Sequence, residues 1–263
     1  MLMAMPLPAL RNLDMMPIEQ DGETLLCLQD REGIVEDPIV LSPVAFFVAS
    51  MLDGTNEVAD IQYAFAQHAR RTLLTSEDIM NVVSFLDQHG FLDSEEYASR
   101  RKNVLEAFER ADARPAYMAG RSYPPHSKEL AAFLESLGES RQQERSAAAP
   151  PLRGLVAPHI DFQRGGSVYA AAYGSLRAQD TPRTAFIFGV AHAGGTTPFI
   201  LTKKSFATPF GTLETDKRIV EYLAGACRWN PYEEEILHRN EHSIEFQTTM
   251  LAHACGPSVR IVP

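Results

Sequence analysis

The spacing of hydrophobic residues changes along the chain, from helical intervals in the first half to alternating strands and helices in the second. Between residues 42 and 92, apolar side chains recur every three or four positions, which predicts three successive helices. Ser42-Pro43 is typical of the start of the first helix, and Thr55 and Thr75 are predicted to cap the second and third. Phe91-Leu92 then predicts a short extended segment. This order is typical of a winged-helix domain.

The segments on either side of the three helices complete a first domain and a connector. Glu23 to Gln29 reads as a strand, and a turn at residues 30–33 would let Ile34-Val35 pair back as a hairpin. Residues 94–114 are charged and predict a solvated helix. Residues 138–151 are polar and alanine-rich, which is typical of a flexible linker. We predict a small winged-helix-like α+β domain over residues 1–110 and, over residues 111–151, a connector that contains a helix starting at Ser127 and a flexible linker.

The remainder of the chain alternates strand and helix patterns. An apolar run over residues 152–157 predicts a short buried strand that ends at Pro158, since proline lacks the N–H that a sheet needs. Residues 184–190 and 259–262 predict two further strands, with helices between them. This alternation predicts an α/β domain with a mostly parallel sheet over residues 152–263. The chain stops inside the last predicted strand, so we expect this domain to be incomplete at its C-terminus.

Two histidines occupy equivalent places in this domain. His159 and His192 each lie just past the carboxyl end of a predicted strand, and glycines follow each of them. Such strand ends meet at one crevice in a parallel sheet. Neutral imidazoles are good ligands for iron, zinc or copper. Either the pair contributes to one metal site, with a third ligand from elsewhere, or these are unrelated loop histidines.

A third histidine needs separate consideration. His238-Arg-Asn-Glu241-His242 fits the H-x-x-E-H motif of inverted zinc proteases. That motif requires one continuous helix, whereas Asn240 is predicted to be an N-cap, which would leave His238 outside it. We therefore expect Glu241 and His242 to line the same crevice as His159 and to serve as catalytic acid–base residues. The structural alternative is a pair that binds backbone N–H groups at a helix start.

Five motifs follow one another in the second half of the chain: Ala119-Gly120-Arg-Ser-Tyr123-Pro, Ala157-Pro-His159, Gly189-Val-Ala-His192, Thr208-Pro-Phe-Gly211 and Glu241-His242-Ser243-Ile-Glu245. On these motifs, residues from about 115 to 263 resemble the Memo family, known in bacteria as AmmeMemoRadiSam system protein B. The resemblance implies an α/β fold similar to class III extradiol dioxygenases, with a non-haem divalent metal. Iron is the first expectation, with copper or zinc as alternatives, and His159 and His192 fall on metal-ligand positions. A radical-SAM protein is the implied partner.

The chain also departs from that family pattern. Met118 stands where family members often have a histidine, and Asp161 stands where they have a glycine. The family's later Asp-x-x-His segment and its ligating cysteine would lie beyond Pro263. We therefore expect at most two ligands of a three-ligand site, and enzymatic activity stays open. The two functional hypotheses are a dioxygenase-like metal protein and a non-catalytic scaffold that binds peptides or proteins.

The first domain and the composition bear on partners and location. Residues 41–92 resemble PqqD-like winged-helix domains, which implies recognition of a peptide. The formal net charge is −10, and the third predicted helix carries Glu77, Asp78 and Asp87 without Lys or Arg, which argues against nucleic acid. Three scattered cysteines without a C-x-x-C pair indicate a reduced, cytoplasmic protein. No apolar run approaches the ~18 residues of a membrane span.

Overall fold

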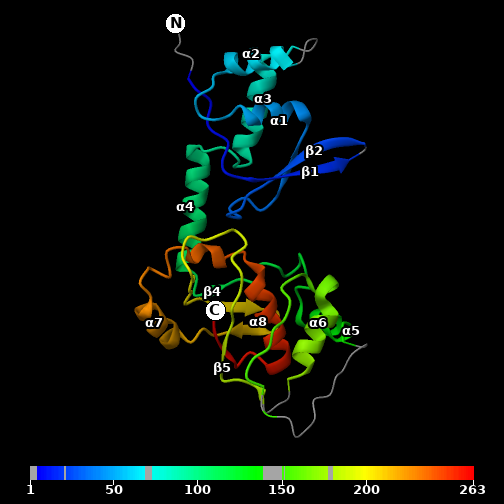
Figure 1. Ribbon diagram of the computed structural model, residues 1–263, viewed down its shortest axis with the longest axis vertical. Coiled ribbons are helices and arrows are strands. Elements are labelled where there is room, and N and C mark those ends of the chain that lie inside the picture. The colour runs from blue at the N-terminus through cyan, green and yellow to red at the C-terminus, as the bar shows by residue number, and fades with distance from the viewer. Residues whose placement is uncertain (1–4, 21, 69–72, 139–149, 151, 177–179) are drawn as a thin grey trace. The chain divides into compact units, whose positions relative to one another are not determined.

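The computed structural model describes residues 5–20, 22–68, 73–138, 150, 152–176 and 180–263. The chain forms two compact units, Met1–Ala107 (unit 1) and Phe108–Pro263 (unit 2), and the boundary between them falls within helix α4, Glu95–Arg110 (Figure 1). The predicted linker falls almost entirely on residues outside the described part. Among the described helices, none combines the length and the apolar character needed to cross a bilayer.

Unit 1 combines a small antiparallel sheet with helices. Its strands are β1 (Asp14–Gln20), β2 (Glu23–Gln29) and β3 (Ile39–Leu41), paired in the order β1-β2-β3. Its helices are α1 (Pro43–Ser50), α2 (Val58–His68), α3 (Ser76–Gln88) and most of α4. The apolar faces of the strands and helices meet in one core that includes Leu28, Ile61, Ile79 and Leu86. The similarity of this unit to winged-helix domains stays a prediction.

Local capping signals predict two of the first three helix starts in unit 1. The Ser42 hydroxyl accepts a hydrogen bond from Ala45 N at the start of α1. At the start of α3, Thr75 and Asp78 form a reciprocal capping box. The predicted Thr55 cap is wrong, because the Asp53 carboxylate accepts Thr55 N at 2.8 Å and α2 begins only at Val58.

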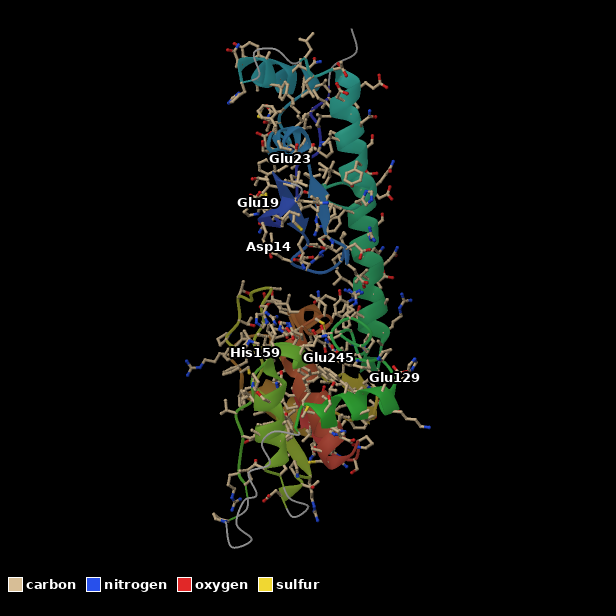
Figure 2. The ribbon with its side chains drawn as sticks, turned by 90° about the vertical axis from the view of Figure 1, so that its right-hand side faces the viewer. Asp14, Glu19, Glu23, Glu129, His159 and Glu245 are labelled. Atoms are coloured by element: carbon tan, nitrogen blue, oxygen red, sulfur yellow. The ribbon has the colours of Figure 1, made fainter. Side chains whose placement is uncertain are left out.

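The predicted hairpin between β2 and Ile34-Val35 is also wrong. Instead, β2 pairs along its whole length with β1, and its other edge pairs with β3. The turn between β1 and β2 contains Gly22 with φ of 81°, a conformation that glycine adopts without strain. Acidic side chains stand along this hairpin at Asp14, Glu19 and Glu23 (Figure 2).

Unit 2 is a mixed α/β structure. One sheet has the order β4 (Ala113–Arg114), β6 (Ser205–Thr208), β7 (Gly211–Leu213), and β5 (Thr184–Phe186) pairs with β8 (Arg260–Val262). The β4–β6 and β5–β8 pairs are parallel, and β6–β7 is antiparallel. The helices are α5 (Ser127–Ser136), α6 (Phe162–Gly174), α7 (Lys217–Ala226) and α8 (His242–Cys255), with a 3-10 turn at Glu235–His238.

Helix α8 is the central helix of unit 2, because its residues are buried over most of its length. Rings from two other segments pack around its Phe246, with centroids 4.9 Å away for Phe162 and 6.2 Å away for Tyr123. Helix α5 lies in the region predicted to be a connector, yet its Leu130 and Leu134 belong to this same core. The apolar face of an amphipathic helix needs a partner, and here that partner is α6 and its neighbours.

The strand predicted at Leu152–Ala157 is wrong, since these residues are irregular and the Val156 side chain is 95% exposed. The strand predicted over residues 184–190 is too long, because β5 ends at Phe186 and Phe188 is 82% exposed. A strand needs a hydrogen-bonded neighbour, and an apolar run cannot supply one by itself. Among the described residues, no strand pairs with residues 152–157.

Candidate functional site

Three histidine rings from distant parts of the sequence lie together in unit 2. The ring centroids of His159 and His192 are 5.1 Å apart, and those of His159 and His242 are 6.0 Å apart. His192 and His242 are stacked, with centroids 4.5 Å apart and planes 19° from parallel. All three line one open cavity of about 640 Å³, and Met118 is also part of its wall.

His159 is positioned by the polypeptide on both sides of it. The preceding carbonyl, Pro158 O, accepts a hydrogen bond from Gln247 Nε2 of α8 at 2.8 Å. The following carbonyl, Ile160 O, accepts one from the Tyr169 hydroxyl at 3.1 Å. Asp161 is the N-cap of α6 and accepts from Arg164 N at 3.0 Å, so the residue that departs from the family glycine has a structural role here.

His192 is held against the start of α8. The Ser243 hydroxyl both accepts from Val190 N at 2.9 Å and donates to Val190 O at 3.0 Å. These two bonds fix the backbone two residues before His192. His242 is the first residue of α8, so its ring is placed by the helix itself. The histidines therefore converge through hydrogen bonds to α6 and α8, although the strands expected to present them are short or absent.

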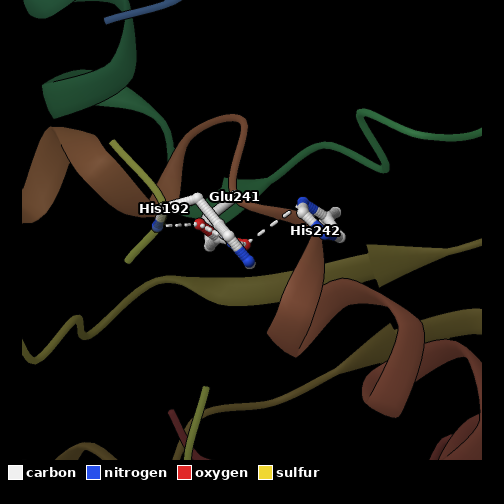
Figure 3. Close-up of side chains that lie close together, drawn as sticks. All are labelled: His192, Glu241 and His242. Carbon is white, nitrogen blue, oxygen red and sulfur yellow. Dashed lines mark hydrogen bonds and ion pairs between the residues drawn. The ribbon is translucent and has the colours of Figure 1, made fainter. Parts of the chain in front are cut away.

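The Glu241 carboxylate connects two of these histidines. It accepts hydrogen bonds from His192 N at 2.8 Å and from Ser243 N at 2.8 Å, which makes Glu241 the N-cap of α8. His192 Nδ1 lies 3.0 Å from Oε1 and 3.1 Å from Oε2, and His242 Nδ1 lies 3.3 Å from Oε1. Figure 3 shows the carboxylate reaching both imidazoles. The prediction that Asn240 is the N-cap of this helix is wrong, because the N-cap is the next residue, Glu241.

Burial and hydrogen bonding set the protonation of this group. Burial raises the pKa of Glu241, but the bonds from His192 and Ser243 outweigh it, and the pKa is lowered overall. Burial lowers the pKa of His242; the neighbouring His192 and His159 lower it further, against the opposing effect of Glu241. At neutral pH the group therefore combines an ionised carboxylate with a neutral His242 ring. The donor atoms of His192, Glu241 and His242 all lie within 4.8 Å of one another.

A buried ion pair next to the site holds the backbone around Glu241 and Met118 in place. Arg114 Nη1 and Glu245 Oε2 are 2.5 Å apart, and both side chains are fully buried. Arg114 also donates to Glu241 O at 2.7 Å and to His238 O at 2.6 Å. The Glu245 carboxylate accepts hydrogen bonds from two backbone N–H groups, Met118 N at 2.8 Å and Tyr117 N at 3.2 Å. It also accepts one from the Tyr123 hydroxyl at 2.5 Å. Figure 2 labels Glu245 among the packed elements of unit 2.

The protease hypothesis fails on the position of His238. This residue lies in the 3-10 turn before α8, is buried, and hydrogen-bonds through Nε2 to Ile200 O at 3.1 Å. It is absent from the wall of the histidine cavity. His238 and His242 therefore do not stand one turn apart on a single helix, as the H-x-x-E-H motif requires.

Gly189 allows α8 to approach the segment that carries His192. A Cβ at this position would overlap Ile244 Cγ1 and lie 2.7 Å from Ser243 Oγ. We expect Gly189→Ala to lower the free energy of unfolding by about 1–3 kcal/mol, as overpacking does elsewhere. The measurement is chemical denaturation followed by fluorescence of Trp229, the single tryptophan of the chain, which lies in unit 2.

Gly225→Ala is the matched control for this prediction. Gly225 lies inside α7, and a Cβ there meets no atom within 4 Å. Alanine has the higher helix propensity, so the control is expected to unfold no more easily than the parent. Equal stability of Gly189→Ala and the parent would show that the contact between α8 and residue 189 is not tight.

The buried Arg114–Glu245 ion pair was not predicted from the sequence. Glu245 stands in one of the quoted motifs without a role, and Arg114 lies outside all of them. Their sequence signal is limited to a charged residue, Glu245, that stands between the apolar residues Ile244 and Phe246. The partner is 131 positions away along the chain, and no local pattern identifies it.

The comparisons with known proteins agree with the motifs around this site. The sequence profile of the family described as "Memo-like protein" matches residues 114–263. A MEMO1 family protein of Aquifex aeolicus is 29% identical over 256 residues, which is 97% of this chain and 65% of that protein. A MEMO1 family protein of Methanopyrus kandleri is 34% identical over 153 residues, 56% of this chain and 53% of the relative. The chain thus spans between half and two thirds of these relatives, and it belongs to the Memo family.

Proposed function

We propose that the protein binds a divalent metal ion through His159 and His192, with His242 as the third ligand. The observation that carries this proposal is the convergence of three imidazoles on one open cavity. Metal–nitrogen bonds are about 2.0–2.1 Å long, so rings bound tetrahedrally to one ion have centres about 5 Å apart. The three separations here, 4.5, 5.1 and 6.0 Å, lie around that value.

The chemistry of the side chains supports the same proposal. Ligating histidines must be neutral, and burial keeps the pKa of His242 low. No protein hydrogen bond to the His159 ring is found among the described residues, so its nitrogens are free to bind a ligand. Imidazole nitrogens suit iron, zinc and copper. The chain belongs to the Memo family, and the resemblance to that family implies a fold like that of class III dioxygenases. Such a fold favours non-haem iron as the metal.

A metal in this position would act as a Lewis acid toward a bound molecule. The residues of the chain would provide the remaining functions. His242 lines the cavity, whereas Glu241, which was predicted to line it too, lies beside it and hydrogen-bonds to His192. The predicted acid–base role of His242 and Glu241 is an alternative to the ligand role of His242, because an imidazole bound to a metal does not exchange a proton at that nitrogen. We propose in addition that the whole protein oxidises the bound molecule, as a dioxygenase-like activity requires.

Metal content tests the proposal directly. We expect elemental mass spectrometry of the purified protein, loaded anaerobically with ferrous iron or with zinc, to find about one ion per chain. His159→Ala and His192→Ala are each expected to lose most of it, because each removes one of three ligands. His126→Ala is the matched control, since His126 is an exposed histidine at the start of α5 in the same unit. Variants that retain as much metal as the control would refute the shared site.

A second candidate function is a non-catalytic scaffold, and one observation favours it. Unit 2 has an apolar cavity of about 750 Å³, and exposed aromatic side chains of Phe186, Phe188 and Phe199 stand in its wall. Exposed apolar patches of this kind often mark protein-binding surfaces.

The scaffold would bind a peptide through unit 1 and act with a radical-SAM partner. A cytoplasmic location fits both candidate functions. Capture of that partner by the whole chain, but not by a chain lacking residues 1–110, would support this candidate.

A further inference from the structure

The ring nitrogens of His192 are not equivalent in this structure. Nδ1 lies within 3.1 Å of both carboxylate oxygens of Glu241. Nε2 has no hydrogen-bond partner among the described residues. An ionised carboxylate can only accept hydrogen bonds, so the proton of a neutral His192 ring must be on Nδ1. This tautomer leaves the lone pair of Nε2 free.

Both oxygens of the Glu241 carboxylate already accept hydrogen bonds. Its oxygens accept the backbone N–H groups of His192 and Ser243 at 2.8 Å each, in addition to the Nδ1 contacts. Its side chain is 10% exposed. The backbone bonds fix the carboxylate against both the His192 loop and the start of α8, so it cannot turn toward the cavity without breaking a helix cap. Glu241 is also absent from the residues that line the histidine cavity.

We propose that Glu241 is a positioning residue, which holds His192 in the Nδ1–H tautomer so that Nε2 is the nitrogen offered to the cavity. This inference deepens the proposed metal site and rests on it for the identity of the ligand at Nε2. Carboxylates commonly orient metal-binding histidines in this way. Glu241 is consequently not a ligand, although its distance from His192 and His242 would allow a two-histidine, one-carboxylate set.

Long-range proton–nitrogen correlation NMR of the metal-free chain tests the tautomer. We expect His192, assigned by comparison with His192→Gln, to be the Nδ1–H form at mildly alkaline pH. In Glu241→Gln the amide no longer provides two acceptor oxygens, so the Nε2–H form should become populated. A wild-type ring that is mainly Nε2–H, or a tautomer ratio unchanged in Glu241→Gln, would overturn the inference.

Glu234→Gln separates this effect from simple loss of loop structure. The Glu234 carboxylate accepts Thr196 N and Thr197 N in the same loop as His192 but is not within hydrogen-bond distance of any of the three histidines. We expect this control to keep the wild-type tautomer. A control that shifts the tautomer as much as Glu241→Gln would assign the effect to the loop and overturn the inference.

Zinc titration provides the second readout. Glu241→Gln is expected to bind zinc about 10- to 100-fold more weakly than the parent, with unchanged stoichiometry. X-ray absorption should find the same nitrogen-rich ligand shell in both proteins, and a lost oxygen ligand in the variant would overturn the inference. If the parent binds no zinc, the proposed metal function fails, whereas an Nδ1–H ring that responds to Glu241→Gln would still support the positioning role.

Discussion

Arg114→Met is expected to lower the free energy of unfolding of unit 2 by about 3–5 kcal/mol, the largest effect we predict for a single substitution. The substitution leaves the Glu245 carboxylate buried without its cation. It also removes the donor from three backbone carbonyls, Pro115 O, His238 O and Glu241 O. An unpaired buried charge is costly because protein atoms around it replace little of the hydration it has lost.

Urea denaturation followed by Trp229 fluorescence measures this loss. Arg164→Met is the matched control, since Arg164 pairs with Asp161 in the same unit but is 73% exposed. An exposed pair contributes about 0–1 kcal/mol, so the control should unfold close to the parent. The double variant Arg114→Met, Glu245→Gln is expected to recover part of the loss, because no charge is then left unpaired. Equal effects of Arg114→Met and Arg164→Met would contradict the assigned role of the buried pair.

The ion pair also affects its neighbours. Burial raises the pKa of the Tyr123 hydroxyl, and the Glu245 carboxylate raises it further. The Tyr123 hydroxyl therefore stays protonated and donates to Glu245 across the physiological range. Because Arg114 bonds to Glu241 O, we expect the proposed metal binding to weaken in Arg114→Met together with its stability.

Acidification is expected to destabilise unit 2 through His238, our second large prediction. Burial lowers the pKa of His238 from 6.5 to about 4, and the nearby Arg114 guanidinium contributes in the same direction. The folded protein therefore keeps this ring neutral where the unfolded chain protonates it. The unfolded state binds more protons between pH 6.5 and about 4, so stability falls as the pH falls through this window. The cost between about pH 7 and about pH 5 is about 2 kcal/mol.

His238→Gln tests the assignment in metal-free protein. The glutamine amide can still donate to Ile200 O, as His238 Nε2 does, but it does not titrate. We expect the unfolding free energy of this variant to change by about 2 kcal/mol less than that of the parent between the two pH values. The comparison cancels the other acidic groups, which titrate in both proteins. A variant with the same pH dependence as the parent would show that His238 is not the responsible group.

Helix starts were the features of this chain that local sequence predicted best. Thr75 and Asp78 lie three residues apart, so the capping box they form depends on the neighbouring backbone alone. Ser42-Pro43 is equally local. The error at Thr55 arose because Asp53, also close in sequence, accepts a hydrogen bond from the Thr55 hydroxyl, the group that would have capped the helix, as well as from the Thr55 and Asn56 N–H groups.

Strands were predicted less well, since each needs a partner that lies elsewhere in the sequence. The apolar run 152–157 has the composition of a buried strand but no ladder partner among the described residues. β1 was missed, although it pairs with β2 over seven residues, because Pro17 and the scattered methionines hide its pattern. Pairing stabilises a strand more than propensity does.

The residue types of the candidate site and the family of the chain follow from local sequence motifs. His159, His192, Glu241 and His242 could all be named from motifs, because each stands beside a turn or helix start with a local signature. Their contacts with one another depend on the fold: the stacking of His192 on His242, the Nδ1 contact of His192 with Glu241, and the neighbouring Arg114–Glu245 ion pair. These are contacts between segments up to 131 positions apart. Such contacts depend on packing around α8, which no local pattern of hydrophobic and polar residues specifies.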